Sequence, residues 1–150
     1  MILKASQRAG GMQLAHHLQK TDDNEHVEIH KIGGFVADDL IGAFKEAHAV
    51  SLGTRCQQFL FSLSLSPPEM AKVPIEVFEQ SIAEIAARMN LDGQPRAIVF
   101  HEKEGRHHAH CVWSRIDVNQ MKAINRTRLP SVSTNATILV VSPPRERPMA

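Results

Sequence analysis

The chain has 150 residues, 43% of them hydrophobic and 22% charged, and its formal net charge is +1. This size fits a single domain with its own core, and the two cysteines exclude a disulfide framework, so we expect a reducing cytoplasm. Neither a signal peptide nor an apolar run long enough to cross a bilayer is visible, and we expect no membrane insertion. Basic residues gather toward both ends, which permits a polyanionic partner there.

Helices and strands alternate along residues 12 to 117. A short helix is predicted after the Gly10-Gly11 break, and Asp38 or Asp39 is the predicted cap of the next helix. In chain order we predict a helix at 12–19, a strand at 27–32, a helix from the cap to about residue 53, a strand at 57–65, a helix at 74–91 and a hairpin at 96–117.

After the short amino-terminal helix the predicted order is therefore β-α-β-α-β-β. This order is typical of an α+β fold with an antiparallel-rich sheet, of the RRM or ferredoxin-like kind, and we expect the helices on one face and the other face open. In the strand at 57–65 the alternation predicts one apolar face and one polar face that carries Ser62 and Ser64. The apolar face consists of Phe59, Phe61, Leu63 and Leu65. That polar face must meet solvent or a ligand.

The hairpin at 96–117 carries three histidines that can converge on one metal ion. His108 and His110 share a strand face because side chains alternate, and the turn at 104–106 brings His101 back beside them. Three imidazoles leave coordination positions open, as in catalytic sites, and Cys111 alternates away from a fourth position. The alternative is a polar surface turn without a ligand.

Other candidate residues have competing interpretations. His16 and His17 lie in the predicted first helix, where a histidine pair is often only surface decoration. Trp113 and Arg115 share a face and either contact a base and a phosphate, or Trp113 belongs to the core.

Three blocks of sequence resemble one known family. They are "MILKASQRAGGMQLAHHL", "GTRCQQFLFSLSLSPPE" and "GQPRAIVFHEKEGRHHAHCVWSRID", and the resemblance covers residues 1 to about 124. The third block contains His108-Ala109-His110 with His101 upstream, and it resembles the motif of the HUH endonucleases. Together the blocks look like the relaxases, the mobilisation nucleases of plasmid transfer.

The resemblance implies a bacterial, metal-dependent enzyme that nicks and transfers one DNA strand at the transfer origin of a plasmid or integrative element. It implies a divalent metal, Mg²⁺ or Mn²⁺, on His101, His108 and His110, acting as a Lewis acid on the scissile phosphate. It also implies single-stranded DNA as the partner, with accessory mobilisation proteins and a type IV secretion coupling protein at the origin. The residues that it makes candidates for phosphate contacts are Lys4, Arg8, Arg106 and Arg115.

The chain departs from the family in having no tyrosine, the usual nucleophile. His17, within "LAHHLQK", occupies the place where relaxases commonly carry that tyrosine, and a histidine can accept a phosphoryl group as a phosphoramidate. The alternative is an inactive accessory protein that binds single-stranded DNA, or a truncated relaxase remnant. A cupin-like metal enzyme is disfavoured, because no glutamate follows His110 closely.

We predict a nuclease domain at 1–125 and an atypical tail at 126–150. The tail is rich in Ser, Thr and Pro and has no long periodic element, as expected of disorder, of one added short strand, or of a truncated or frame-shifted gene.

Overall fold

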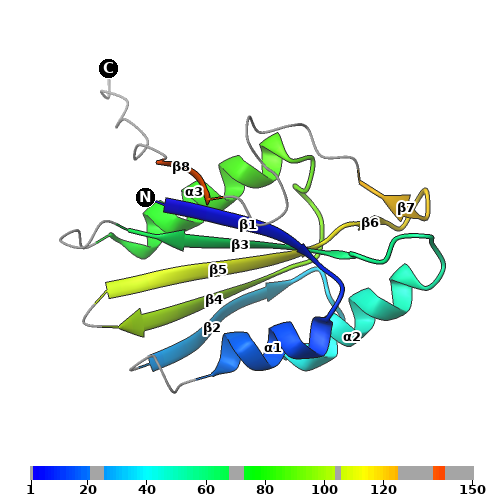
Figure 1. Ribbon diagram of the computed structural model, residues 1–150, viewed down its shortest axis with the longest axis horizontal. Coiled ribbons are helices and arrows are strands. Elements are labelled where there is room, and N and C mark those ends of the chain that lie inside the picture. Colours follow the sequence, from blue (N-terminus) through cyan, green and yellow to red (C-terminus); the bar gives the residue numbers. More distant parts are fainter. Residues whose placement is uncertain (1, 21–25, 68–72, 104–105, 125–136, 141–150) are drawn as a thin grey trace.

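A computed structural model describes residues 2–20, 26–67, 73–103, 106–124 and 137–140. Six strands form one antiparallel sheet in the order β2-β4-β5-β3-β1-β8, and a second, two-stranded sheet pairs β6 with β7. The strands are β1 (Ile2–Arg8), β2 (His26–Gly33), β3 (Leu60–Ser66), β4 (Arg96–Lys103), β5 (Arg106–Ser114), β6 (Ile116–Asp117), β7 (Lys122–Ala123) and β8 (Thr137–Val140). The helices are α1 (Gly11–Gln19), α2 (Leu40–Ser51) and α3 (Ile75–Arg88). Figure 1 shows the strands running side by side, with β2 next to α1 and α2.

Local signals in the sequence account for the helix ends. The side chain of Asp39 accepts a hydrogen bond from the Gly42 amide at 3.1 Å and so caps α2, one of the two residues predicted for this role. After α3, Asn90 adopts a left-handed conformation (φ 58°), and the Leu91 amide donates to the Ala86 carbonyl at 2.8 Å. Each predicted helix and strand between residues 12 and 117 is thus confirmed, with boundaries that differ by a few residues.

The prediction that the helices share one face of the sheet is wrong. Helix α3 packs on one face through Phe78, Ile82 and Ile85, whereas α1 and α2 pack on the other through residues such as Leu18 and Phe44. The reason lies in the central strands, which are buried on both sides. The consecutive apolar run 97–100 in β4 is the signal typical of such a strand.

The sequence did not predict strand β1. The observed order of elements begins with this strand and not with the short helix. Its residues pair with β3 from Ile2 opposite Ser66 to Arg8 opposite Leu60. Four of its seven residues are Lys4, Ser6, Gln7 and Arg8, so it does not look like a core strand in isolation. The short strand β8 pairs with its other edge, and the rest of the predicted tail lies outside the described residues.

Candidate active site

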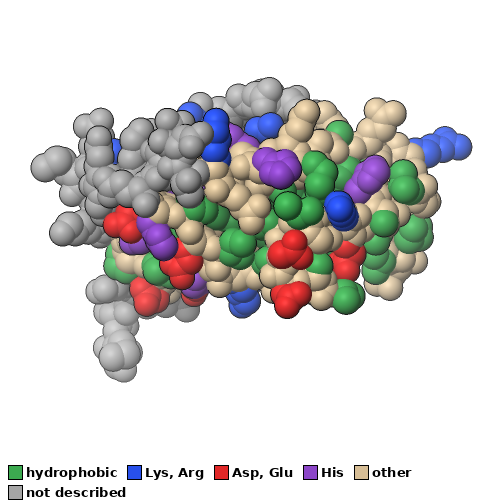
Figure 2. Space-filling model, turned by 90° about the horizontal axis from the view of Figure 1, so that it is seen from below, with side chains coloured by type: hydrophobic (Ala, Val, Ile, Leu, Met, Phe, Trp, Pro, Cys, Tyr) green, Lys and Arg blue, Asp and Glu red, His purple; other side chains and the backbone are tan. Residues whose placement is uncertain are grey.

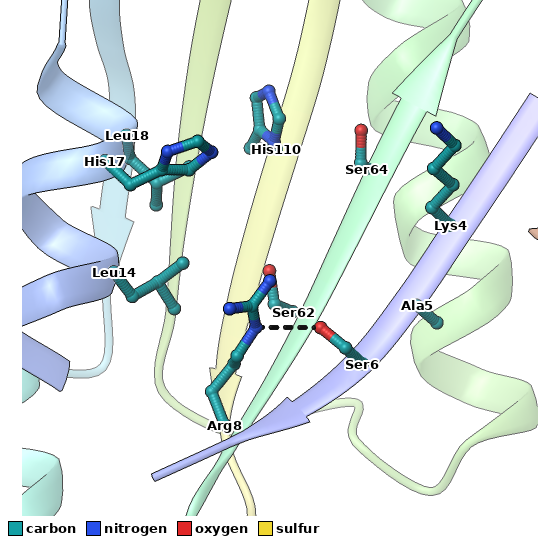
Figure 3. Close-up of a pocket in the computed structure, with 10 residues that line it drawn as sticks. All are labelled: Lys4, Ala5, Ser6, Arg8, Leu14, His17, Leu18, Ser62, Ser64 and His110. Atoms are coloured by element: carbon teal, nitrogen blue, oxygen red, sulfur yellow. Dashed lines mark hydrogen bonds between the residues drawn. The ribbon is translucent and has the colours of Figure 1, made fainter. Parts of the chain in front are cut away.

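The polar side chains of β1 and β3 form the floor of a hollow on the face that carries α1 and α2. The apolar residues of these helices cover β4 and β5 on this face, where Ala97, Val99 and Val112 are buried against them. Toward β3 and β1 the sheet is open, and a hollow of about 300 Å³ lies there. Its floor consists of Lys4, Ser6 and Arg8 from β1 and Ser62 and Ser64 from β3 (Figure 3).

Strand register places these floor residues in rows that lead to the histidines. Lys4 lies opposite Ser64, and Ser64 lies opposite His110 on β5. In the adjacent row, Ser6 lies opposite Ser62, and the Arg8 side chain reaches back so that its Nε donates to Ser6 Oγ at 3.0 Å (Figure 3). The floor therefore presents two cations and three hydroxyl groups to whatever enters the hollow.

The three hairpin histidines lie together, as predicted. His101 on β4 is paired with His108 on β5, and His110 is two residues further along the same strand face. The ring centroids of His101 and His110 are 4.5 Å apart. His108 Nδ1 lies 3.2 Å from Ser66 Oγ, at the end of β3.

Helix α1 brings His17 into the same hollow. Leu14 and Leu18 of this helix are buried against the core, and His17, between them in sequence, is exposed and lines the hollow. Figure 3 shows His17 reaching from α1 toward His110 on β5. His16 is exposed and does not contribute to the lining.

Burial keeps the two inner histidines neutral. The pKa of His110 is lowered to about 3, first by burial and then by the neighbouring rings of His101, His17 and His108. The pKa of His101 is also lowered, chiefly by burial, against the opposing effect of its hydrogen bond to the Leu18 carbonyl. At neutral pH both rings are therefore uncharged.

A relationship to known proteins is visible over most of the chain. The family model described as "Relaxase: MobA/VirD2-like, nuclease domain" matches residues 13–136. The chain belongs to this relaxase family. No curated protein and no solved structure matches it.

As a member of this family, the chain is a nuclease domain that acts on DNA. Relaxases usually need a divalent metal. The match begins within α1 and so includes His17 and all three hairpin histidines, while β1 precedes it. Over the described residues, no helix is long and apolar enough to cross a bilayer.

The hairpin histidines fit a divalent ion in residue type, placement and charge, because a metal binds the neutral imidazole. The orientation of the rings differs from that of a formed centre. Within the described residues, no group of three or more His, Cys, Asp or Glu side chains is arranged to hold a metal. His101 Nε2 lies 2.5 Å from the Leu18 carbonyl, so this nitrogen carries a proton and becomes a metal ligand only if that hydrogen bond breaks. The assignment of His101, His108 and His110 as ligands stays a prediction.

The structure does not bring together all four basic residues that are predicted to contact phosphates of the DNA. Lys4 and Arg8 line the hollow, and Arg106 begins β5 on the same strand face as His108. Arg115 lies after β5, where its Nη1 donates to the Gln58 carbonyl at 2.7 Å and lies 3.8 Å from Cys56 Sγ. It does not line the hollow.

Sequence reasoning missed Ser6 and treated Ser62 and Ser64 only as a polar strand face. The alternation of Leu3 and Ala5 with Lys4 and Ser6 was the available signal for β1. Trp113, by contrast, is fully buried on the α3 side, so of its two interpretations the core one is confirmed.

Proposed function

We propose that this relaxase cuts and rejoins one DNA strand at the transfer origin of a plasmid or integrative element, using a divalent metal and His17 as the nucleophile. The observation that carries the proposal is that His17, from α1, lines the same hollow as His110, Lys4 and Arg8. A nucleophile, a histidine of the predicted metal centre and a cationic floor thus surround one space.

The charges of the hollow suit a phosphodiester. Its described lining includes a lysine, an arginine and two histidines and contains no carboxylate. The backbones of Lys4 and Arg8 are about 14 Å apart on an extended strand. The Arg8 side chain reaches back to Ser6, so the two cations lie closer together than their backbones and can contact neighbouring phosphates of a strand that lies along β1. The serine hydroxyls between them can donate to phosphate oxygens.

A divalent ion on His101, His108 and His110 would polarise the scissile phosphate and stabilise the charge that develops on its oxygens. The chain's own contribution is the covalent step. A ring nitrogen of His17 attacks phosphorus, and a P–N bond to the 5′ phosphate forms as the P–O bond to the 3′ oxygen breaks. The 3′ oxygen takes up a proton and leaves as a hydroxyl, and the imidazole loses its remaining N–H proton to solvent. Attack by a 3′ hydroxyl on the same phosphorus reverses these changes and rejoins a strand.

The experiment uses single-stranded oligonucleotides tiled across the DNA that flanks the gene, labelled at the 3′ end, with Mg²⁺ or Mn²⁺. We expect the label to migrate with the protein on a denaturing gel, and mild acid to release it, because a P–N bond to histidine is acid-labile. His17→Ala should abolish the adduct, and His16→Ala, the exposed neighbour outside the hollow, should retain it. An adduct that persists in His17→Ala contradicts the proposed nucleophile.

The metal centre has a separate test. His108→Ala should remove metal-dependent cleavage and weaken Mn²⁺ binding measured by calorimetry, whereas His26→Ala, on the edge strand β2, should change neither. Unchanged Mn²⁺ binding in His108→Ala would refute the assignment.

The second candidate function is an accessory protein that binds single-stranded DNA without cutting it. The absence of tyrosine favours it, because the usual nucleophile of the family is missing. Salt-dependent binding with no metal-dependent nicking of any tiled oligonucleotide would select this function.

A further inference from the structure

A second hollow lies next to the candidate active site, on the other side of the β1–α1 junction. It has a volume of about 340 Å³ and is bounded by the first turn of α1, by α2 and by the segment before β3. Arg8 and Leu14 line the candidate active site, whereas Ala9 and Gln13 line this second hollow. The first turn of α1 is therefore the wall between two adjoining spaces.

The lining of the second hollow combines aromatic rings with one cation. Phe59 is buried, and the ring of His48 lies against it with centroids 5.3 Å apart and planes 35° apart. His48 itself is exposed, so a planar group can stack against this ring pair. Lys45 lies one helical turn before His48 on the same side of α2 and also lines the hollow.

The electrostatics favour an anionic ligand with a flat ring. The described residues that line the hollow include no carboxylate. The nearest acidic residue on α2, Glu46, is turned away and accepts hydrogen bonds from the Val36 amide at 3.0 and 3.1 Å. Figure 2 views the molecule from the side on which α1 and α2 lie in Figure 1, and on that face hydrophobic and histidine side chains lie beside both basic and acidic ones.

We propose that this hollow is a subsite for one nucleotide of the same DNA strand, outside the cleavage site, whose base stacks on His48 and whose phosphate pairs with Lys45. The proposal rests on the proposed function, because the strand reaches the hollow by passing Arg8. The volume is at the lower end of ligand pockets, which suits a single nucleotide. Stacking and a cation are the elements by which proteins hold single strands without reading their sequence.

The test measures binding in the presence of a chelator, by fluorescence anisotropy, with two labelled probes. One is a fifteen-nucleotide oligo-dT, and the other is an abasic strand of equal length and charge. Stacking of one base corresponds to about 5-fold to 150-fold in affinity. We expect His48→Ala to weaken binding of oligo-dT by on the order of tenfold and to leave the abasic strand unaffected. His48→Phe should restore the affinity, and His16→Ala should behave as wild type.

Lys45→Gln should weaken the binding of both probes equally and reduce the salt dependence of binding, because it removes a phosphate contact and not a stacking partner. Thermal unfolding of each variant shows whether the fold is retained. The proposal is overturned if wild type binds oligo-dT and His48→Ala weakens the binding of both probes equally or of neither probe. If wild type binds neither probe, the proposed function fails as well.

Discussion

The two faces of β1 and β3 differ sharply although they belong to the same strands. Toward α3, Leu3, Ala5 and Leu63 are buried in one of the two core clusters. Toward α1, the intervening residues Lys4 and Ser64 line the candidate active site. Alternation along a strand therefore separates residues that hold the sheet together from residues that meet a ligand, and substitutions on the two faces should have separable effects.

The largest effect is expected on the α3 face. Phe61 of β3 is fully buried and packs near Trp113, with ring centroids 6.0 Å apart. Phe61→Ala should lower the free energy of unfolding by about 3–5 kcal/mol, because it leaves a cavity. Urea denaturation followed by circular dichroism measures the change, and Phe61→Leu should cost clearly less. Equal losses for both variants would show that cavity formation is not the cause.

A smaller effect is expected where the polar face meets α1. His101 is 6% exposed and bonds to the Leu18 carbonyl, so His101→Ala leaves that carbonyl without this partner. In a chelator the free energy of unfolding should fall by about 1–3 kcal/mol. The comparison is His108→Ala, which is less buried and should cost less. If the order of the two is reversed, the bond between β4 and α1 contributes little to stability.

The cationic floor should affect DNA binding and leave stability nearly unchanged. Lys4→Gln removes one expected phosphate contact, so the slope of log affinity against log salt should become shallower by about 0.7. Titrations of oligo-dT at several salt concentrations measure the slope. Lys31→Gln, on the edge strand β2, is the matched control, and a similar change in slope there would indicate general attraction rather than a contact in the hollow.

The smallest effect on stability is expected at Ser64, which is partly exposed in the hollow. Ser64→Ala should change the free energy of unfolding by no more than about 0.5 kcal/mol. Leu63→Ala, one residue away on the buried face, should cost about 2–5 kcal/mol. Similar costs for these two neighbours would contradict the separation of the faces.

How much the sequence could predict depends on how local each signal is. The α3 stripe, the Asp39 cap and the 96–117 hairpin depend on neighbouring residues, and the structure confirms them. Strand β1 was missed because its partner β3 lies more than fifty residues away and its own side chains are mostly polar. The presence of helices on both faces of the sheet was not predicted. The face that a helix covers depends on how the chain crosses from one strand to the next, which the pattern within the helix does not show.

Local contacts of the candidate site were predicted as well, whereas its long-range contacts were not. Alternation brought His101, His108 and His110 together, because they belong to one hairpin. The hydrogen bond between His101 and the Leu18 carbonyl joins residues 83 apart in sequence, and no pattern in either segment indicates it. The importance of His17 came from the family resemblance, and the structure adds that His17 and His110 line one hollow.

The pairing of β1 with β3 and β8 also bears on how the molecule folds. The β4–β5 hairpin closes over a few residues, whereas residues 2–8 must wait for partners at 60–66 and 137–140. Contacts between distant segments form slowly, because the loop between them must first be closed at an entropic cost. When the complete chain refolds, we therefore expect the hairpin histidines to meet one another before Lys4 and Arg8 reach the floor. On that order, a partly folded chain presents the histidines without the cations that are proposed to hold a DNA strand beside them.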